Sequence, residues 1–184
     1  MSLADAKSDA RKAAFGRRKA VHATGLDAVA QVYLAEYLSQ WPDAPLAGYM
    51  PILSEIDPLP VMAARTSVVG VPVIQGKGHP LTFRAWTPNA EMVEGPFGAL
   101  VPKSGTDIVP EGLSVPLVAF DVAGYRRGYG GGFYDRTLEG LRRQGRIRAV
   151  GFAYEAQRVA ALPREATDQP LDAVVTELGA QTFP

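Results

Sequence analysis

The segment from Val115 to Leu138 holds glycines, arginines and a carboxylate in an order that suits the binding of a phosphate group. An apolar run ends at Asp121, and an amphipathic helix is predicted to begin at Phe133. A glycine-rich turn lies between them, with Gly128, Gly130, Gly131 and Gly132. Glycine reaches positive φ and lets the backbone approach a ligand closely. The start of a helix offers free N–H groups and the positive end of its dipole. This order therefore predicts an anion site.

Charged side chains flank these glycines. Arg126 and Arg127 are donors of the kind that hold phosphate oxygens. Asp135 would lie in the first turn of the helix, where it could meet a metal bound to the same phosphate. Because neither the P-loop pattern nor the dinucleotide fingerprint is present, a glycine-rich hairpin with exposed arginines is the alternative interpretation.

The same segment resembles the signature of the 5-formyltetrahydrofolate cyclo-ligase family, also called methenyltetrahydrofolate synthetases. The resemblance is carried by Phe120-Asp121, Gly124-Tyr125-Arg126 and Gly128-Tyr129-Gly130-Gly131-Gly132-Phe133-Tyr134-Asp135-Arg136. Similar pieces lie across most of the chain, and they are Lys7 with Arg11, Met50 to Glu55, Phe97-Gly98 and Leu171 to Glu177. The chain departs from the family pattern at Arg127, at 99–102 and at Thr167 before Asp168, which leaves details of substrate contact open.

The resemblance implies sites for ATP, a folate and Mg²⁺. The implied ATP site, in which Arg126 is also catalytic, consists of Lys7, Arg11, Arg126, Arg127, Gly128, Tyr129, Gly130, Gly131, Gly132, Phe133 and Tyr134. The folate pocket is assigned to Met50 and Glu55, with rings that could stack on the substrate at Tyr129, Phe133, Tyr134 and Trp86. Asp135, Asp168 and Asp172 are candidates for a Mg²⁺ site. The resemblance implies Asp135 and Asp172 as the ligands, and it leaves open whether Asp168 or Asp172 is the second one.

Each of these residues also has a structural interpretation. Lys7 and Arg11 share one face of a helix, yet a basic helix is commonly a solvated one. Asp172 could be an exposed charge at the start of a strand, and Asp168 could initiate a turn. Glu55 could serve as a charge near the start of the helix predicted at 59–65.

Alternating helices and strands must position these residues. Helices are predicted at 3–20, 26–40, 59–65 and 133–144, and strands at 47–53, 68–74, 81–86, 115–120, 147–152 and 173–176. The second helix shows a core-facing stripe of Leu26, Val29, Ala30, Tyr33, Leu34, Tyr37 and Leu38. We expect an α/β sandwich, one domain over residues 1–184, with a largely parallel central sheet flanked by helices. The Gly- and Pro-rich stretch 87–112 suggests a long functional loop.

Composition narrows the class of protein. The chain has 184 residues, zero formal net charge and no cysteine. Zero net charge gives no reason to expect a nucleic acid or an anionic membrane as partner, and the lack of cysteine excludes disulfides and thiolate chemistry. No apolar run is long enough for a membrane span or a signal peptide. We expect a cytoplasmic monomer that acts on small molecules.

The resemblance implies ATP-dependent cyclisation of 5-formyltetrahydrofolate to 5,10-methenyltetrahydrofolate, through phosphorylation of the formyl oxygen to an iminium phosphate. ADP and phosphate are released. Two alternatives stay open at this point. A sugar-phosphate isomerase on a related scaffold would bind phosphate without needing ATP. A catalytically silent folate- or nucleotide-binding module would bind without turnover.

Overall fold

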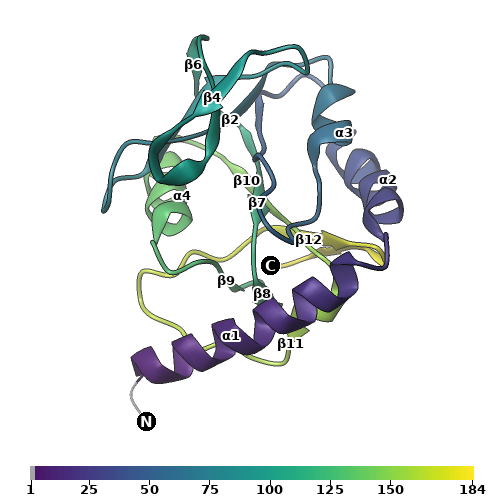
Figure 1. Ribbon diagram of the computed structural model, residues 1–184, viewed down its shortest axis with the longest axis vertical. Helices are drawn as coiled ribbons and strands as arrows, with labels where there is room; N and C mark the ends of the chain where they lie inside the picture. The colour runs from purple at the N-terminus through teal and green to yellow at the C-terminus, as the bar shows by residue number, and fades with distance from the viewer. Residues whose placement is uncertain (1–2) are drawn as a thin grey trace.

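The computed structural model describes residues 3–184, except for the side chains of residues 3, 4, 6 and 7 (Figure 1). Within that range the main sheet consists of β1 (Leu46–Ala47), β2 (Val69–Ile74), β3 (Leu81–Ala85), β6 (Asp107–Ile108), β7 (Gly112–Pro116), β10 (Arg148–Phe152), β12 (Ala173–Thr176) and β13 (Gly179–Thr182). Their order is β13-β12-β10-β7-β1-β2-β3-β6. The strands from β12 to β2 run parallel, and antiparallel strands extend both edges. The largely parallel sheet expected from the sequence is confirmed.

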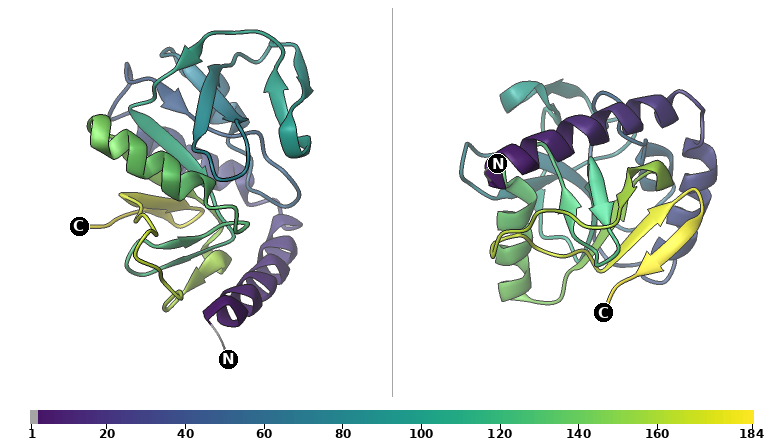
Figure 2. Two further views of the ribbon diagram at one scale, coloured as in Figure 1. Left: turned by 90° about the vertical axis from the view of Figure 1, so that its left-hand side faces the viewer. Right: turned by 90° about the horizontal axis from the view of Figure 1, so that it is seen from below.

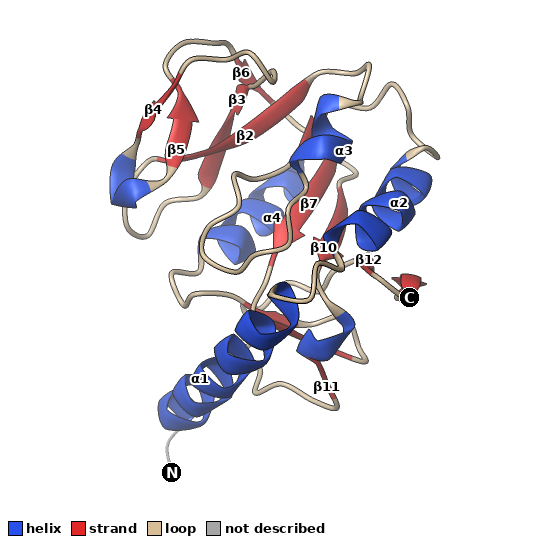
Figure 3. Cartoon of the chain, turned by 45° about the vertical axis from the view of Figure 1, so that its right-hand side comes forward, coloured by secondary structure: helices blue, strands red, loops and turns tan. Residues whose placement is uncertain are grey.

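Helices lie on both faces of this sheet (Figures 1 and 3). The helices of the described residues are α1 (Leu3–His22), α2 (Asp27–Leu38), α3 (Leu59–Ala63) and α4 (Phe133–Gln144), and of these α2 and α4 cover opposite faces of the sheet. On one face, Leu138 of α4 packs with Leu113 and Val115 of β7. On the other face, Leu34 of α2 packs with Phe152 of β10. This arrangement confirms the α/β sandwich, whereas the expectation of a single domain stays a prediction.

Helix α1 lies apart from these two layers and crosses one end of the molecule (Figure 2). It packs beside a second, small sheet of β8 (Ala119–Asp121), β9 (Arg126–Arg127) and β11 (Arg158–Val159). A hairpin of β4 (Met92–Glu94) and β5 (Leu100–Pro102) encloses the short 3₁₀ helix η1 (Pro96–Gly98), and a second 3₁₀ helix, η2 (Glu155–Gln157), precedes β11. No helix in the described range 3–184 combines the length and the apolar content needed to cross a bilayer.

The structure corrects several element boundaries. The strand expected at 115–120 is two strands in different sheets, broken at Leu117 and Val118. At this break the Leu117 carbonyl accepts hydrogen bonds from the side chains of Arg18 and Gln157, which replace a strand partner. The strand expected at 47–53 ends at Ala47, and the loop expected at 87–112 contains β4, η1, β5 and β6.

Helix α2 differs in one residue of its expected stripe. Ala30, Leu34 and Leu38 are buried at a spacing of four residues. Val29 is 47% exposed, so its assignment to the core face was wrong. The four-residue spacing turns one narrow face toward the sheet, and Val29 lies outside that face.

Candidate functional site

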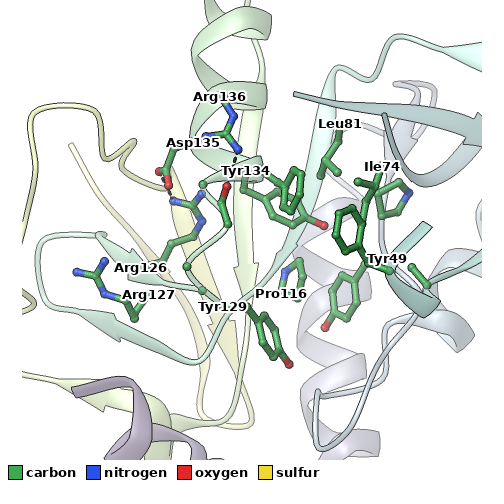
Figure 4. Close-up of a pocket in the computed structure, with 18 of the residues that line it drawn as sticks. Tyr49, Ile74, Leu81, Pro116, Arg126, Arg127, Tyr129, Tyr134, Asp135 and Arg136 are labelled. Carbon is green, nitrogen blue, oxygen red and sulfur yellow. Dashed lines mark hydrogen bonds and ion pairs between the residues drawn. The ribbon is translucent and has the colours of Figure 1, made fainter. Parts of the chain in front are cut away.

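A cavity of about 790 Å³ opens at the carboxyl ends of strands β1 and β7 (Figure 4). Tyr49 and Met50 enter it after β1, and Pro116 enters it from the last position of β7. All residues from Arg126 to Arg136 also line it. Ligands of open α/β sheets bind at this edge, and the volume lies in the range of small-molecule sites. The cavity is therefore the candidate active site.

The cavity has two chemically different sides (Figure 4). Arg126, Arg127 and Asp135 lie on one side, and the side chains of Tyr49, Ile74 and Leu81 lie on the other. Glycines and the start of α4 lie between them. Such an arrangement suits an elongated ligand, or a pair of ligands, with an anionic part and an aromatic part.

The glycine loop is built for close approach to a ligand. Gly130 has φ 95° and Gly132 has φ 66°, backbone conformations that other residues rarely adopt. A Cβ at Gly130 would lie 3.0 Å from a guanidinium nitrogen of Arg11, so a side chain there would displace Arg11. Gly132 precedes α4 and provides no side-chain cap. The first N–H groups of α4 are thus left for an anion.

Arg126 is fixed by its neighbours in the folded protein. It is 8% exposed, and its Nη1 donates to Asp135 Oδ1 at 2.9 Å and to the Gln169 carbonyl at 3.2 Å. Its guanidinium also lies 5.9 Å from the centroid of the Tyr134 ring. A guanidinium held on one side in this way can present its other N–H groups to a phosphate without first losing conformational freedom.

Three further arginines line the same cavity, and each has a buried Nε atom. The Nε atoms of Arg11, Arg127 and Arg136 are buried, and within the described residues none of them has a hydrogen-bond partner. All three arginines line the cavity. Arg127 donates from its other end to the Pro163 carbonyl. Buried donors without a partner cost free energy in the folded protein, and the three guanidinium groups add positive charge to this part of the cavity wall. The side chain of Lys7 lies outside the described residues.

The two proposed metal ligands lie at opposite ends of α4. Asp135, in its first turn, lines the cavity. Asp172 does not line it: its Oδ2 accepts from the Ala149 N–H at 2.7 Å and lies 3.4 Å from Nη2 of Arg142 in the last turn of α4. Asp172 directly precedes β12 and so lies at the starts of the parallel strands. The cavity lies at the opposite ends of these strands. The structure therefore does not bring Asp172 to the site.

The acidic residues at the cavity suit a Mg²⁺ that arrives with a nucleotide. Asp135 and Asp168 both line it. Within the described part of the chain, no group of three or more His, Cys, Asp or Glu side chains could hold a metal by itself. Mg²⁺ usually takes one or two carboxylates and completes its shell with phosphates and water. One carboxylate at Asp135 fits that requirement, with Asp168 next to the same space.

Glu55 lies in the cavity wall and is 5% exposed. Its Oε2 accepts a hydrogen bond from the Ile52 N–H at 2.9 Å, and its Oε1 lies 3.9 Å from Nη1 of Arg18. Burial raises the pKa of Glu55, and the Ile52 hydrogen bond, the Arg18 charge and the Tyr129 hydroxyl oppose that rise. The helix-start role does not apply to Glu55, because Asp57 accepts the Leu59 N–H at the start of α3.

Tyr129 connects the glycine loop to Glu55. Its hydroxyl accepts a hydrogen bond from Nη2 of Arg18 at 2.7 Å, and its ring lies 5.3 Å from that of Phe15. Burial, and secondarily the charge of Glu55, raises the pKa of Tyr129 to about 12. The hydroxyl therefore remains protonated at neutral pH and can donate to the Glu55 carboxylate.

Of the aromatic and apolar residues expected to contact a ligand, all but one line the cavity. Met50, Phe133 and Tyr134 line the cavity together with Tyr129. Trp86 does not, because it is buried in a cluster with Met62, Val69 and Val71. Sequence patterns did not predict the cavity residues Ile74 and Leu81, whereas Thr167, noted as a departure from the family pattern, does line the cavity. Sequence patterns also did not predict the burial of Arg18. The one local signal is Ala14, a small apolar residue one turn earlier on the same face of the helix.

The raised pKa of Glu55 predicts how stability depends on pH. The folded protein keeps the Glu55 proton to a higher pH than the unfolded chain does. The stability from this carboxyl is fully present below the ordinary pKa of 4.5 and is lost as pH rises through the raised value. We expect Glu55→Gln to become more stable relative to the unchanged protein across that window. Urea unfolding of both proteins from about pH 4 to about pH 8 measures this, and a difference that is constant with pH would contradict it.

Comparison with known proteins agrees with this geometry. The model of the 5-formyltetrahydrofolate cyclo-ligase family matches residues 28–177. The 5-formyltetrahydrofolate cyclo-ligases of Haemophilus influenzae and Escherichia coli K12 are each 43% identical to this chain, over 98 and 101 residues. These alignments cover 50% and 52% of this chain, and 52% and 55% of the relatives. The chain thus spans about half the length of these curated relatives.

Solved structures resemble the fold over nearly the whole chain. The 5,10-methenyltetrahydrofolate synthetase of Aquifex aeolicus is 28% identical, with a TM-score of 0.77 over 96% of this chain and 92% of its own. The Mycoplasma pneumoniae enzyme of the same name, at 22% identity, shares the fold with a TM-score of 0.73 over 93% of this chain and 98% of its own. With the family model matching most of its length, the chain belongs to the 5-formyltetrahydrofolate cyclo-ligase family.

Proposed function

We propose that this protein catalyses the ATP-dependent cyclisation of 5-formyltetrahydrofolate to 5,10-methenyltetrahydrofolate, with release of ADP and phosphate. The observation that carries the proposal is that a single cavity combines a glycine loop and arginine side chains with a buried carboxylate and apolar walls. The relatives named above carry this activity in their names. Because one chain lines the whole cavity, we also propose a monomer, acting in the cytoplasm where ATP is available.

The proposed reaction needs no covalent intermediate with the protein. The formyl oxygen attacks the γ-phosphorus of ATP, and the bond from that phosphorus to ADP breaks. N10 of the same folate then attacks the formyl carbon and loses its proton. The carbon–oxygen bond breaks, and phosphate leaves with the former formyl oxygen. The protein must therefore supply in-line positioning and neutralise charge at the transferred phosphoryl group.

The cationic side of the cavity would bind the nucleotide. Arg126 is proposed as the catalytic residue, since its fixed guanidinium can stabilise charge that moves during phosphoryl transfer. Arg11 and Arg127 would hold the remaining phosphate oxygens with the loop from Gly128 to Gly132. Lys7, one helical turn before Arg11, is proposed as a further phosphate contact from the family resemblance.

Mg²⁺ would be held by Asp135 together with the nucleotide phosphates. When bound, the ion would draw charge away from the phosphate oxygens. The chain's own contribution is the Asp135 carboxylate, which also orients Arg126 through the 2.9 Å ion pair. Asp172, placed at the far end of α4, has no part in this proposal.

The opposite side would bind the folate. Glu55 can accept two parallel hydrogen bonds from the amide and amino groups of a pterin. Met50, Tyr129 and Phe133 would contact the rings of the substrate. The carboxylate must be ionised to accept both hydrogen bonds, and its contacts with Ile52 and Arg18 favour that form.

Turnover tests the proposed reaction directly. Purified protein should convert 5-formyltetrahydrofolate only when ATP and Mg²⁺ are both present, forming one ADP for each methenyl product. Absorbance of the methenyl product and a coupled assay for ADP measure this. Equal rates without nucleotide would contradict the ligase assignment, and saturable folate binding with no turnover would indicate a binding module.

Arg126→Ala should lower kcat by about 10²-fold or more, because the arginine is proposed to stabilise charge in the transition state. Arg143→Ala is a matched control: its side chain is 75% exposed on the last turn of α4. Steady-state kinetics of both variants at saturating substrates give the comparison. A wild-type kcat in Arg126→Ala would assign the arginine a structural role only.

The metal assignment distinguishes Asp135, in the first turn of α4, from Asp172, which precedes β12 and pairs with the last turn of α4. Asp135→Asn keeps the shape but removes the charge, so it should raise the Mg²⁺ concentration needed for half-maximal rate by about ten-fold. Asp172→Asn should leave that concentration unchanged, because its carboxylate binds Ala149 and Arg142. Magnesium titrations of the rate decide the matter, and the reverse ranking of the two variants would show that the wrong aspartate was chosen.

A further inference from the structure

Arg18 is fully buried, although it lies on α1 between the exposed residues Arg17 and Lys19. Its guanidinium makes contacts on every side. Nε donates to Ser54 Oγ at 3.1 Å, Nη1 donates to the Leu117 carbonyl at 3.3 Å, and Nη2 donates to the Tyr129 hydroxyl at 2.7 Å. Burial of a cation is costly unless it is paired in this way, so the position of Arg18 is tightly determined.

Two of these three partners of Arg18, Ser54 and Tyr129, belong to segments that line the cavity. Tyr129 belongs to the glycine loop that is proposed to hold the nucleotide phosphates, and its own ring is proposed to contact the folate. Ser54 adjoins Glu55, the carboxylate at the folate side, whose Oε1 lies 3.9 Å from Nη1 of Arg18. Arg18 itself does not line the cavity. It therefore acts on any ligand only through these two segments.

Neither segment has regular secondary structure to hold it. Residues 48–58 between β1 and α3 contain Leu53 at φ 54°, a conformation that is unfavourable for leucine. Leu53 is 81% exposed, so its own side chain does not stabilise the turn. The turn is held instead by the Ile52–Glu55 hydrogen bond and by the Arg18–Ser54 hydrogen bond on either side of Leu53.

We propose that Arg18 is a positioning residue that holds the glycine loop and the Ser54–Glu55 turn in a fixed relation, so that each substrate improves the binding of the other. The inference rests on the proposed function and adds to it a source of coupling between the two sides of the cavity. A nucleotide that orders the glycine loop fixes Tyr129, and through Arg18 it fixes Glu55 for the folate. By thermodynamic reciprocity the folate must favour the nucleotide by the same factor.

The first test needs no ligand. Hydrogen exchange is compared in Arg18→Met and in the matched control Arg17→Met, which changes the exposed neighbour. We expect faster exchange in residues 48–56 and 126–134 of Arg18→Met only. If Arg18→Met does not fold, Ser54→Ala and Tyr129→Phe each remove one Arg18 hydrogen bond, and each should loosen the segment of its partner as well as its own. Unchanged exchange in the partner segment would overturn the proposal.

The second test measures the coupling itself. Dissociation constants of 5-formyltetrahydrofolate and of a non-hydrolysable ATP analogue are determined alone and together. In the unchanged protein each ligand should tighten the other by about ten-fold, within the range usual for coupled sites. This factor should fall close to one in Arg18→Met and should be partly kept in Arg18→Lys. A residue that only stabilises the fold would lower the melting temperature and leave the factor intact, which would overturn the proposal.

The two tests also separate this inference from the proposed function. If the unchanged protein binds neither ligand, the proposed function fails, while the hydrogen-exchange comparison still decides whether Arg18 holds the two segments together. If both ligands bind and turn over without mutual enhancement, the proposed function stands and the coupling role of Arg18 is wrong.

Discussion

Asp121 lies at the end of β8 and has no solvent exposure. Its Oδ1 accepts hydrogen bonds from the N–H groups of Ala123 and Tyr125, which close the turn into β9. Its Oδ2 accepts from the Leu162 N–H and from Nη2 of Arg164. A buried carboxylate is tolerated only when its oxygens are satisfied in this way. The hairpin β8–β9 and the segment that begins at Leu162 are therefore fixed relative to each other.

The side of the cavity that is proposed to bind the nucleotide is positioned by these Asp121 contacts. The hairpin carries Arg126, and the segment after Leu162 leads to Gln169, whose carbonyl accepts from Arg126 and whose N–H donates to Asp135. Arg126, Asp135 and Gln169 come from three separate parts of the chain, and each contact constrains the other two. The charged groups that would meet a phosphate are thus arranged before any ligand binds, which is the condition for electrostatic catalysis.

The side of the cavity that is proposed to bind the folate depends on a single buried carboxylate and not on a network of fixed charges. Glu55 is a single buried carboxylate whose pKa is raised by burial, so its ionised form costs stability in the folded protein. Arg18 and Ile52 reduce that cost without removing it. A group that destabilises the free protein and would gain hydrogen bonds from a ligand is typical of a binding site, where stability and function compete.

Local patterns predicted much of this arrangement. The sequence placed α4 at its observed bounds, because the glycines end at Gly132 and the apolar spacing begins at Phe133. It also predicted the parallel sheet and the residues of the glycine loop, which the structure brings together with Glu55. These features depend on neighbours in the chain, where periodicity and turn chemistry are informative.

Features that depend on long-range contacts were not predictable in this way. Arg18 appeared to be one more charge on a solvated helix, and only its distant partners Leu117 and Tyr129 explain its burial. Trp86 and Asp172 have residue types that suit a site, yet strand register places both away from the cavity. Composition and spacing do not reveal which edge of a sheet a residue reaches.

The central claim is that the cavity brings ATP to the formyl oxygen of a bound folate, so that phosphate departs with that oxygen. The most direct measurement uses 5-formyltetrahydrofolate labelled with ¹⁸O in the formyl group, followed by mass spectrometry of the phosphate released during turnover. The account predicts one ¹⁸O atom in each phosphate, carried over from the formyl group. Unlabelled phosphate, with the ¹⁸O recovered in water, would contradict it.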